Sequence, residues 1–515
     1  MFREQGADKQ VKMVSTPREK RLFCAIFMGV IALHLILILS TRLYPFTDIP
    51  NHLAAATIVR YIGEPSNSFA DYYSVDVFLK PNSFHPIFCS LALFPSPEFA
   101  NRVYLALYAI LLPVSVYLII RKLGGNPWFS LLSFLLLYNF NVSWGFVGFF
   151  FAIPLVLFFC YFFIFDARGL AGASRILWAA AFLVFIYFVH LLAALFCLLL
   201  PFLAPAPDSR RIFRALPGRL LASLPLVVLL AGWWRGEMRG YPGPGILQFL
   251  SEYYRNSYLE SVIHRKSIFL FDNYHLSVGA RGYFIAVVFS LSIVVPAVVL
   301  FFRDRIRAGR TRFGFPPPLI LGAFLCCLLL PNEIPRQSVL YERFSSLLLI
   351  ALVIYAGMRA PEKLHRAAVA GIVAISLLHY ALWTDYFIDF NKENAGFDRA
   401  FLRPSGNDGK LAGLVYDYAY RGRTVFIHFP SYYIVWEKGI ATSRVAEYRF
   451  SAIRKTAGGR AIPWYLEWVG KGNAYDGRYR DMDYLLIRGG SAPEGFALER
   501  AAGKWSLYGR TAPFP

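Results

Sequence analysis

The sequence predicts a mainly α-helical membrane protein, in which a polytopic bundle of about 11–13 spans precedes a small extracytoplasmic α/β domain. Three observations predict this fold class. Hydrophobic residues make up 57% of the 515 residues, more than the roughly 45–50% of ordinary soluble domains. They gather in long runs between short polar breaks, which is typical of membrane-spanning helices. After Trp383 these runs stop, and charged residues alternate with short segments of β-forming residues.

The expected membrane domain covers residues 22–383, after a polar and basic tail at residues 1–21. Each span is a run of about 15–22 apolar residues, and several are short or contain Pro or Gly, which indicates tilted or broken helices. The spans are expected at Leu22–Thr41, Val103–Ile120, Pro127–Phe140, Phe149–Phe165, Ile176–Val189, Leu191–Leu203, Leu220–Trp234, Tyr283–Phe302, Leu319–Leu330, Ser345–Met358 and Ala367–Trp383. The apolar piece Phe84–Phe94 is too short to cross, so it either forms a half-inserted helix or pairs with the next span and changes the count.

The distribution of charge predicts the orientation. The net charge is +21, but the basic residues lie in short clusters between apolar segments. This pattern is typical of cytoplasmic loops and of attraction to anionic lipid headgroups, so no nucleic-acid partner is expected. Arg18, Lys20 and Arg21 precede the first span. We therefore expect a retained first span and not a signal peptide, a cytoplasmic N-terminus, and a multi-pass protein of a bacterial inner (plasma) membrane.

The same rule assigns the other segments to a side of the membrane. Outer loops at 42–101 and 235–281 and the C-terminal domain at 384–515 are expected outside the cytoplasm. In the C-terminal domain, strands are expected at Thr424–His428, Asp483–Ile487 and Trp505–Tyr508. The loop at 235–281 is rich in aromatic residues, so it is either a lid over a lipid tail or an inert interfacial loop.

Asp48 is the candidate catalytic residue. It lies in a short polar loop, Thr47–His52, directly after the first span. A surface helix over Pro50–Tyr61, lying on the membrane, would hold the carboxylate toward the bundle for proton chemistry on a lipid-linked substrate. The alternative is that Asp48 is only the N-cap of this helix. His52 either orients the substrate or Asp48, or is an ordinary interfacial histidine.

Cationic side chains near the outer ends of spans are candidate ligands for a lipid phosphate. Lys80 and His85 end the first outer loop, while Arg336 and Arg343 lie on the face that should be poor in arginine. A guanidinium pairs with phosphate through two parallel N–H donors, so Arg343 is the strongest candidate, with Glu342 as its orienting partner. The ordinary alternatives are a lysine that reaches toward the headgroups and a surface Arg–Glu pair.

Three more candidate substrate-binding residues lie at outer turns. His190 stands between two apolar runs, where it either lines a cavity or is a hydrogen-bonded structural histidine. Asn141 and Trp144 begin a span, and an amide and an indole suit sugar recognition, although Trp is also a normal residue of the membrane interface.

Cofactor and nucleotide motifs are absent from the sequence. It has no P-loop, no G-x-G-x-x-G, no H-E-x-x-H and no G-x-S-x-G. All six cysteines lie in apolar runs without C-x-x-C spacing, so neither a metal site nor a disulfide framework is indicated. We expect no cofactor.

Several segments, in order, resemble the GT-C superfamily of polytopic glycosyltransferases, which includes the protein mannosyltransferases and the lipid A aminoarabinose transferase. Asp48 follows the first span, and Phe84-His85-Pro86 is similar to the His-Pro-Pro or Tyr-Pro-Pro of these enzymes. Pro95–Arg102 resembles their helix-opening segment, and Tyr117–Gly124 resembles their basic turn. The likeness covers about the first quarter of the chain. Many relatives have Asp-Glu at the catalytic position, where this chain has Asp48 and Ile49.

The resemblance implies transfer of a sugar from a polyprenyl-phosphate donor to a glycan, lipid or protein acceptor on the extracytoplasmic face. Asp48 would be the general base of an inverting reaction, and Arg343 with Lys80 or His85 would stabilise the leaving phosphate. Two alternatives remain: a transporter or flippase of an amphipathic lipid-linked substrate, and a non-catalytic membrane protein of polysaccharide assembly.

Overall fold

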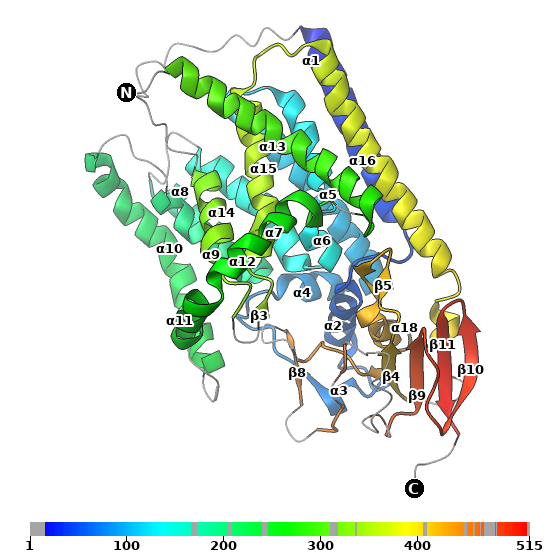
Figure 1. Ribbon diagram of the computed structural model, residues 1–515. Coiled ribbons are helices and arrows are strands. Elements are labelled where there is room, and N and C mark those ends of the chain that lie inside the picture. Colours follow the sequence, from blue (N-terminus) through cyan, green and yellow to red (C-terminus); the bar gives the residue numbers. More distant parts are fainter. Residues whose placement is uncertain are drawn as a thin grey trace.

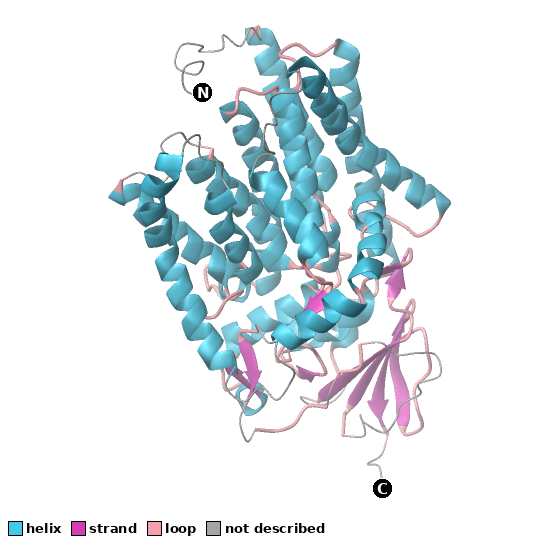
Figure 2. Ribbon diagram, turned by 60° about the vertical axis from the view of Figure 1, so that its left-hand side comes forward, coloured by secondary structure: helices cyan, strands magenta, loops and turns pink. Residues whose placement is uncertain are grey.

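The structure is a computed structural model that describes residues 16–165, 172–203, 209–238, 246–274, 276–308, 318–334, 337–404, 409–447, 451–456, 459–463, 465–467, 479 and 481–511. A bundle of helices forms most of it, and a β-sheet lies at one end (Figures 1 and 2). The expected mainly α-helical class with a small strand-containing C-terminal region is confirmed.

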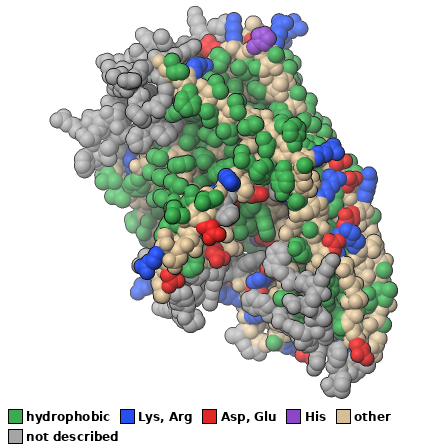
Figure 3. Space-filling model, in the orientation of Figure 1, with side chains coloured by type: hydrophobic (Ala, Val, Ile, Leu, Met, Phe, Trp, Pro, Cys, Tyr) green, Lys and Arg blue, Asp and Glu red, His purple; other side chains and the backbone are tan. Residues whose placement is uncertain are grey.

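Seven helices in the described residues are long and apolar enough to cross a membrane. Each contains or overlaps a predicted span. They are α1 (Pro17–Ser40), α5 (Pro97–Lys122), α7 with the π-turn η2 (Val147–Ile164), the part of α10 (Ser209–Met238) at Leu216–Gly236, the part of α13 (Ala280–Ala308) at Ala280–Asp304, α15 (Tyr341–Arg359) and α16 (Arg366–Glu393). The outward faces of α10 and α13 carry exposed apolar side chains such as Leu221 and Phe284, and Figure 3 shows such side chains over much of the bundle.

The other predicted spans form shorter elements. Three are apolar helices: α8 (Ala173–Val189), α9 (Leu191–Leu203) and α14 (Pro318–Leu329). The predicted span at Pro127–Phe140 instead contains the 3₁₀ helix η1 (Pro127–Leu136), and residues 129–136 of that helix are all buried. The piece at Phe84–Phe94 forms α4 (Phe84–Ser90), which at ~1.5 Å per residue spans only about 10 Å and does not cross.

Basic turns meet at one end of the bundle. The Asn126 amide after α5 donates to the Pro361 carbonyl oxygen at 2.9 Å, and Arg303 of α13 donates to the Arg359 carbonyl oxygen at 2.6 Å. The sheet lies at the opposite end (Figure 1). This arrangement separates the arginine-rich turns from the C-terminal region, as the predicted topology requires. Which end faces the cytoplasm stays a prediction.

The C-terminal sheet has the strand order β10-β11-β9-β4-β7. Its strands are β4 (Lys410–Val415), β7 (Ile440–Ala441), β9 (Tyr484–Arg488), β10 (Phe496–Ala502) and β11 (Trp505–Arg510). β4 is parallel to β7 and β9, while β11 is antiparallel to both of its neighbours. The strands predicted near Asp483 and Trp505 are confirmed as β9 and β11.

The strand predicted at Thr424–His428 is wrong. Only β6 (Arg423–Thr424) is extended there, and the chain continues as the 3₁₀ helix η4 (Phe426–Ser431). All six side chains of η4 are buried, and Phe429 stacks on Trp505 with ring centroids 5.4 Å apart. A short apolar run that is buried on every side shows neither the period of a strand nor that of a helix. The apolar, β-forming residues of this run therefore led to the prediction of a strand.

Helix α2 (Ile49–Tyr61) confirms the helix predicted after Asp48, but it is not a surface helix. Most of its residues from Ile49 to Ile58 are buried, because η4 and α18 (Tyr432–Glu437) pack against it. The Ser431 hydroxyl donates to the Asn51 side-chain oxygen at 2.7 Å. The polar start of α2 therefore faces the C-terminal region and not a membrane surface.

Candidate functional site

The backbone of Asp48 is fixed by the turn at the end of α6 (Phe140–Trp144). The Asp48 N–H donates to the Trp144 carbonyl oxygen at 3.0 Å, and the Thr47 hydroxyl donates to the Thr424 carbonyl oxygen at 2.7 Å. Asp48 occupies the N-cap position of α2, but its side chain makes no capping hydrogen bond. The simple N-cap reading is therefore not supported, and the carboxylate is available for other contacts.

Gly145 lets these two turns approach each other. Its φ of +77° is a left-handed conformation, and a Cβ there would lie 2.8 Å from the Asp48 backbone nitrogen. Both the conformation and the space require glycine at this position. The segment Asn141–Gly145, expected to bind sugar, thus also positions Asp48 through its backbone.

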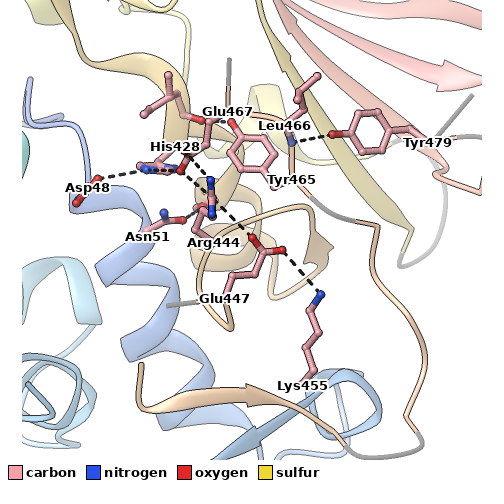
Figure 4. A network of polar contacts seen from close by, with 12 residues as sticks. Asp48, Asn51, His428, Arg444, Glu447, Lys455, Tyr465, Leu466, Glu467 and Tyr479 are labelled. Atoms are coloured by element: carbon pink, nitrogen blue, oxygen red, sulfur yellow. Dashed lines mark hydrogen bonds and ion pairs between the residues drawn. The ribbon is translucent and has the colours of Figure 1, made fainter. Parts of the chain in front are cut away.

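The Asp48 carboxylate faces His428 of η4. Its Oδ1 lies 3.2 Å from His428 Nε2, and the same nitrogen lies 3.5 Å from Glu467 Oε1 (Figure 4). The side chain of Asp48 is 15% exposed and that of His428 1%. A protonated Nε2 has a single N–H, and of the two carboxylate oxygens the one on Asp48 is the nearer acceptor. In the described part of the chain, His428 is the one side chain bonded to the Asp48 carboxylate.

A chain of ion pairs holds Glu467. Arg444 NH2 donates to Glu467 Oε2 at 3.0 Å, and Arg444 Nε lies at ion-pair distance, 3.0 Å, from Glu467 Oε1. Arg444 also lies 3.6 Å from Glu447, whose other oxygen is 3.8 Å from Lys455 Nζ (Figure 4). Burial raises the pKa of the Glu447 carboxyl, and Arg444 and Lys455 oppose that rise. Glu467 is thus neutralised by an arginine, whereas Asp48 is not.

His52 and His85 form a neutral pair beside Asp48. The His52 backbone N–H donates to the Asp48 carbonyl oxygen at 3.1 Å. The His52 ring meets the His85 ring edge-on, with ring centroids 5.4 Å apart. Burial lowers the pKa of His52 to about 4 and that of His85 to about 3. His85 therefore offers a phosphate a neutral ring and not a positive charge.

Arg343, His190 and Asn141 come together at the start of α15. Arg343 NH1 lies 3.4 Å from His190 Nε2, and its guanidinium carbon lies 3.9 Å from the Phe146 ring centroid. The Asn141 amide donates to the Arg343 carbonyl oxygen at 3.0 Å. The charges of Asp48, His428 and Arg343 all act on His52, so this cluster and the Asp48 loop belong to one electrostatic environment.

Other sequence candidates lie apart from this group or contribute differently. Lys80 is buried and forms an ion pair with Asp76 at 2.9 Å, so a carboxylate already meets its charge. Trp144 supplies a backbone carbonyl, and its ring stacks on Phe146 at 6.1 Å. Glu342 lies in the first turn of α15 and accepts a hydrogen bond from Ser345 through its carbonyl oxygen at 2.6 Å. Arg336 lies outside the described residues.

The described part of the aromatic-rich outer loop forms helices beside a cavity. These are α11 (Ile246–Asn256) and α12 (Tyr258–His264), and the cavity is about 530 Å³. Its lining combines carboxylates, amides and tyrosines, including Glu252, Asn332 and Tyr341. Asp48 does not line this cavity.

Sequence reasoning missed His428, Glu467 and Arg444, which complete the surroundings of Asp48. One available signal was a histidine at the end of an apolar run, Thr424–His428, in a domain expected beside the Asp48 loop. Together these residues place a carboxylate, several imidazoles and a guanidinium at one end of an apolar bundle. No family model, no curated protein and no solved structure matches this chain.

Proposed function

We propose that this protein is a membrane glycosyltransferase that moves a sugar from a polyprenyl-phosphate donor to an acceptor, with inversion and with Asp48 as general base. One observation carries the proposal. The Asp48 carboxylate stands at a helix start without capping it, and it faces His428 at 3.2 Å. The GT-C-like order of segments around Asp48, Phe84–Pro86 and Pro95–Arg102 supports the same reaction class.

The chemistry requires one proton transfer and one displacement. Asp48 accepts the proton of the acceptor hydroxyl or amine as its oxygen or nitrogen attacks the anomeric carbon. The bond between that carbon and the phosphate oxygen breaks on the opposite face, and polyprenyl phosphate leaves with the electron pair. Base catalysis of this kind contributes about two to four orders of magnitude in rate.

His428 acts as a positioning residue in this proposal. Its Nε2–H donates to Asp48 Oδ1, which leaves Oδ2 as the oxygen that takes the proton. Glu467 lies on the other side of the same nitrogen and is held by Arg444 at 3.0 Å. The carboxylate at Asp48 thus keeps one orientation before the substrate arrives, which lowers the reorganisation needed in the transition state.

Arg343 is the proposed phosphate ligand. Its guanidinium is held over the Phe146 ring and by the Val339 carbonyl oxygen at 2.8 Å. A guanidinium held on two sides presents its planar fork in a fixed orientation, which suits recognition of a phosphate. Lys80 has no such role in the proposal, because the Asp76 carboxylate already meets its charge.

The test is turnover of purified protein with polyprenyl-phosphate mannose, glucose and aminoarabinose as donors. Asp48→Asn keeps the shape of the side chain and removes the base, so release of polyprenyl phosphate should fall at least about 100-fold. Asp71→Asn is the matched control, because Asp71 is an exposed aspartate of the same loop whose ion pair with Arg460 spans 3.8 Å. Turnover by folded Asp48→Asn at the wild-type rate would rule out the proposed mechanism.

A further inference from the structure

A second, smaller cavity lies between the bundle and the C-terminal region. It has a volume of about 90 Å³ and is lined by the turn after α1, by α2, by the first turns of α5 and by α18. The lining residues that matter here are Arg42, Arg102, Glu98, Asn101 and Tyr432. A water molecule needs roughly 10–15 Å³ in such a measure, so the cavity has room for a group of several heavy atoms.

Positive charge predominates in this cavity. In the described residues, no carboxylate lies within ion-pair distance of Arg42 or Arg102. Glu98, the one acidic side chain of the lining, accepts a hydrogen bond from the Trp436 indole at 2.9 Å. Arg42 is anchored by donating to the Phe397 carbonyl oxygen at 2.7 Å and to the Asn394 carbonyl oxygen, and the charge of Asp398 also acts on it. Burial and the Glu98 carboxylate raise the pKa of the Tyr432 phenol, and Arg42 and Arg102 oppose that rise, so all three charges face the same part of the cavity.

An unpartnered donor completes the lining. Asn101 is 1% exposed, and its side-chain oxygen lies 3.0 Å from His85 Nε2. Its amide nitrogen has no hydrogen-bond partner among the described residues. A buried donor without an acceptor is unfavourable, and an anionic oxygen in the cavity would satisfy it.

The surroundings indicate what carries the anion. The cavity lies where α1 ends and α5 begins, and both helices present exposed apolar side chains there, including Leu39 and Phe99. A phosphate joined to a hydrocarbon chain fits both features. Its charge would pair with the arginines of the cavity, and its chain would lie along the apolar side chains beside the cavity.

We propose that Arg102, Arg42 and the Asn101 amide bind the phosphate of a membrane lipid. This site adjoins the Asp48 site, because Asn101 contacts His85 and the His85 ring meets that of His52, but the proposal does not depend on sugar transfer. The two sources of the phosphate are a phospholipid headgroup and free inorganic phosphate, and the apolar rim favours the lipid.

The experiment measures binding to the delipidated, detergent-purified full chain by native mass spectrometry. The probes are phosphatidylglycerol, inorganic phosphate, and diacylglycerol as the lipid without phosphate. Wild type should bind phosphatidylglycerol at least about tenfold more tightly than Arg102→Gln does. Arg60→Gln is the matched control, because Arg60 lies near the end of α2, donates to the Phe94 carbonyl oxygen at 3.0 Å and does not line the cavity.

Each outcome decides the proposal. Equal binding of phosphatidylglycerol by wild type and Arg102→Gln would overturn it, as would equal binding of diacylglycerol. If inorganic phosphate binds as tightly as phosphatidylglycerol, the lipid assignment is overturned. Should Arg102→Gln fail to fold, Asn101→Asp replaces it, since that change removes the donor, adds negative charge and keeps the shape, and it should also weaken binding at least about tenfold.

Discussion

At the scale of single residues, the surroundings of Asp48 distinguish a base from a structural cap. The neighbouring carboxylate Glu467 is paired with Arg444, whereas among the described residues the Asp48 carboxylate contacts His428 Nε2. Two carboxylates on one imidazole nitrogen thus have different surroundings, and in the proposed mechanism Asp48 is the one that takes the proton. Because His428 contacts both carboxylates, substitution of His428 is the most direct test of the proposed role of Asp48 after substitution of Asp48 itself.

We expect His428→Phe to lower kcat about tenfold, because the ring stays and the hydrogen bond that orients Asp48 is lost. The KM for the donor should change little, since His428 does not touch the phosphate ligand Arg343. Steady-state kinetics of His428→Phe, Asp48→Asn and the double variant check this. The double variant should be no slower than Asp48→Asn, because one side chain acts through the other. Additive losses would contradict the assignment.

His85 makes stability depend on pH. Burial lowers its pKa from 6.5 to about 3, so the folded protein keeps the ring neutral while the unfolded chain protonates it below pH 6.5. The unfolded state then binds more protons, and stability is full above pH 6.5 and falls as pH drops toward 3, by up to about 1.4 kcal/mol per pH unit for this one group.

Thermal unfolding in detergent at pH 7, 6 and 5 measures this dependence. We expect Tm to fall over this range, and to fall less steeply in His85→Gln. A His85→Gln slope equal to that of the wild type would show that this imidazole is charged in the folded state.

At the scale of elements, the site depends on the close approach of two turns. Gly145 ends α6 with a positive φ, and a Cβ there would meet the backbone of Asp48 at 2.8 Å. Gly145→Ala should destabilise the protein by about 1–3 kcal/mol and move the Asp48 loop, which lowers both stability and turnover. Gly63→Ala is the control, because no atom lies within 4 Å of a Cβ at Gly63 and its φ is not positive. The measurements are Tm and turnover of Gly145→Ala and Gly63→Ala. Equal values for the two variants would contradict the requirement for glycine at position 145.

The sequence predicted elements well where one pattern dominates. Long apolar runs such as those of α1 and α5 became membrane-length helices, and β9 and β11 appear where they were expected. It failed where burial is uniform, as in η4, or where a partner is distant in the chain. Asp48 and His428 are 380 residues apart, and no local period of hydrophobicity reports such a contact. The same limit explains why α2 was expected at the surface, although α18 covers it.

At the scale of the whole molecule, the bundle separates two kinds of ends. The C-terminal ends of α13 and α15, joined by the hydrogen bond from Arg303 to the Arg359 carbonyl oxygen, lie at one end, and α2 and the sheet lie at the other (Figure 1). In the proposed function, a substrate with a hydrocarbon chain and a polar head meets an apolar wall and the Asp48 site together at the second end. A lipid-linked donor that is used outside the cell therefore requires that this end be extracytoplasmic.

Single cysteines introduced into a chain without its native cysteines test the orientation. We expect a membrane-impermeant maleimide to label Glu494→Cys in intact spheroplasts, because Glu494 is exposed in the C-terminal region. Lys363→Cys should be labelled only after lysis, because Lys363 is exposed between α15 and α16 at the basic end. The positive-inside rule gives this orientation independently of any site residue. The reverse labelling pattern would place Asp48 in the cytoplasm, where soluble nucleotide sugars are available, and would remove the reason for a polyprenyl-phosphate donor.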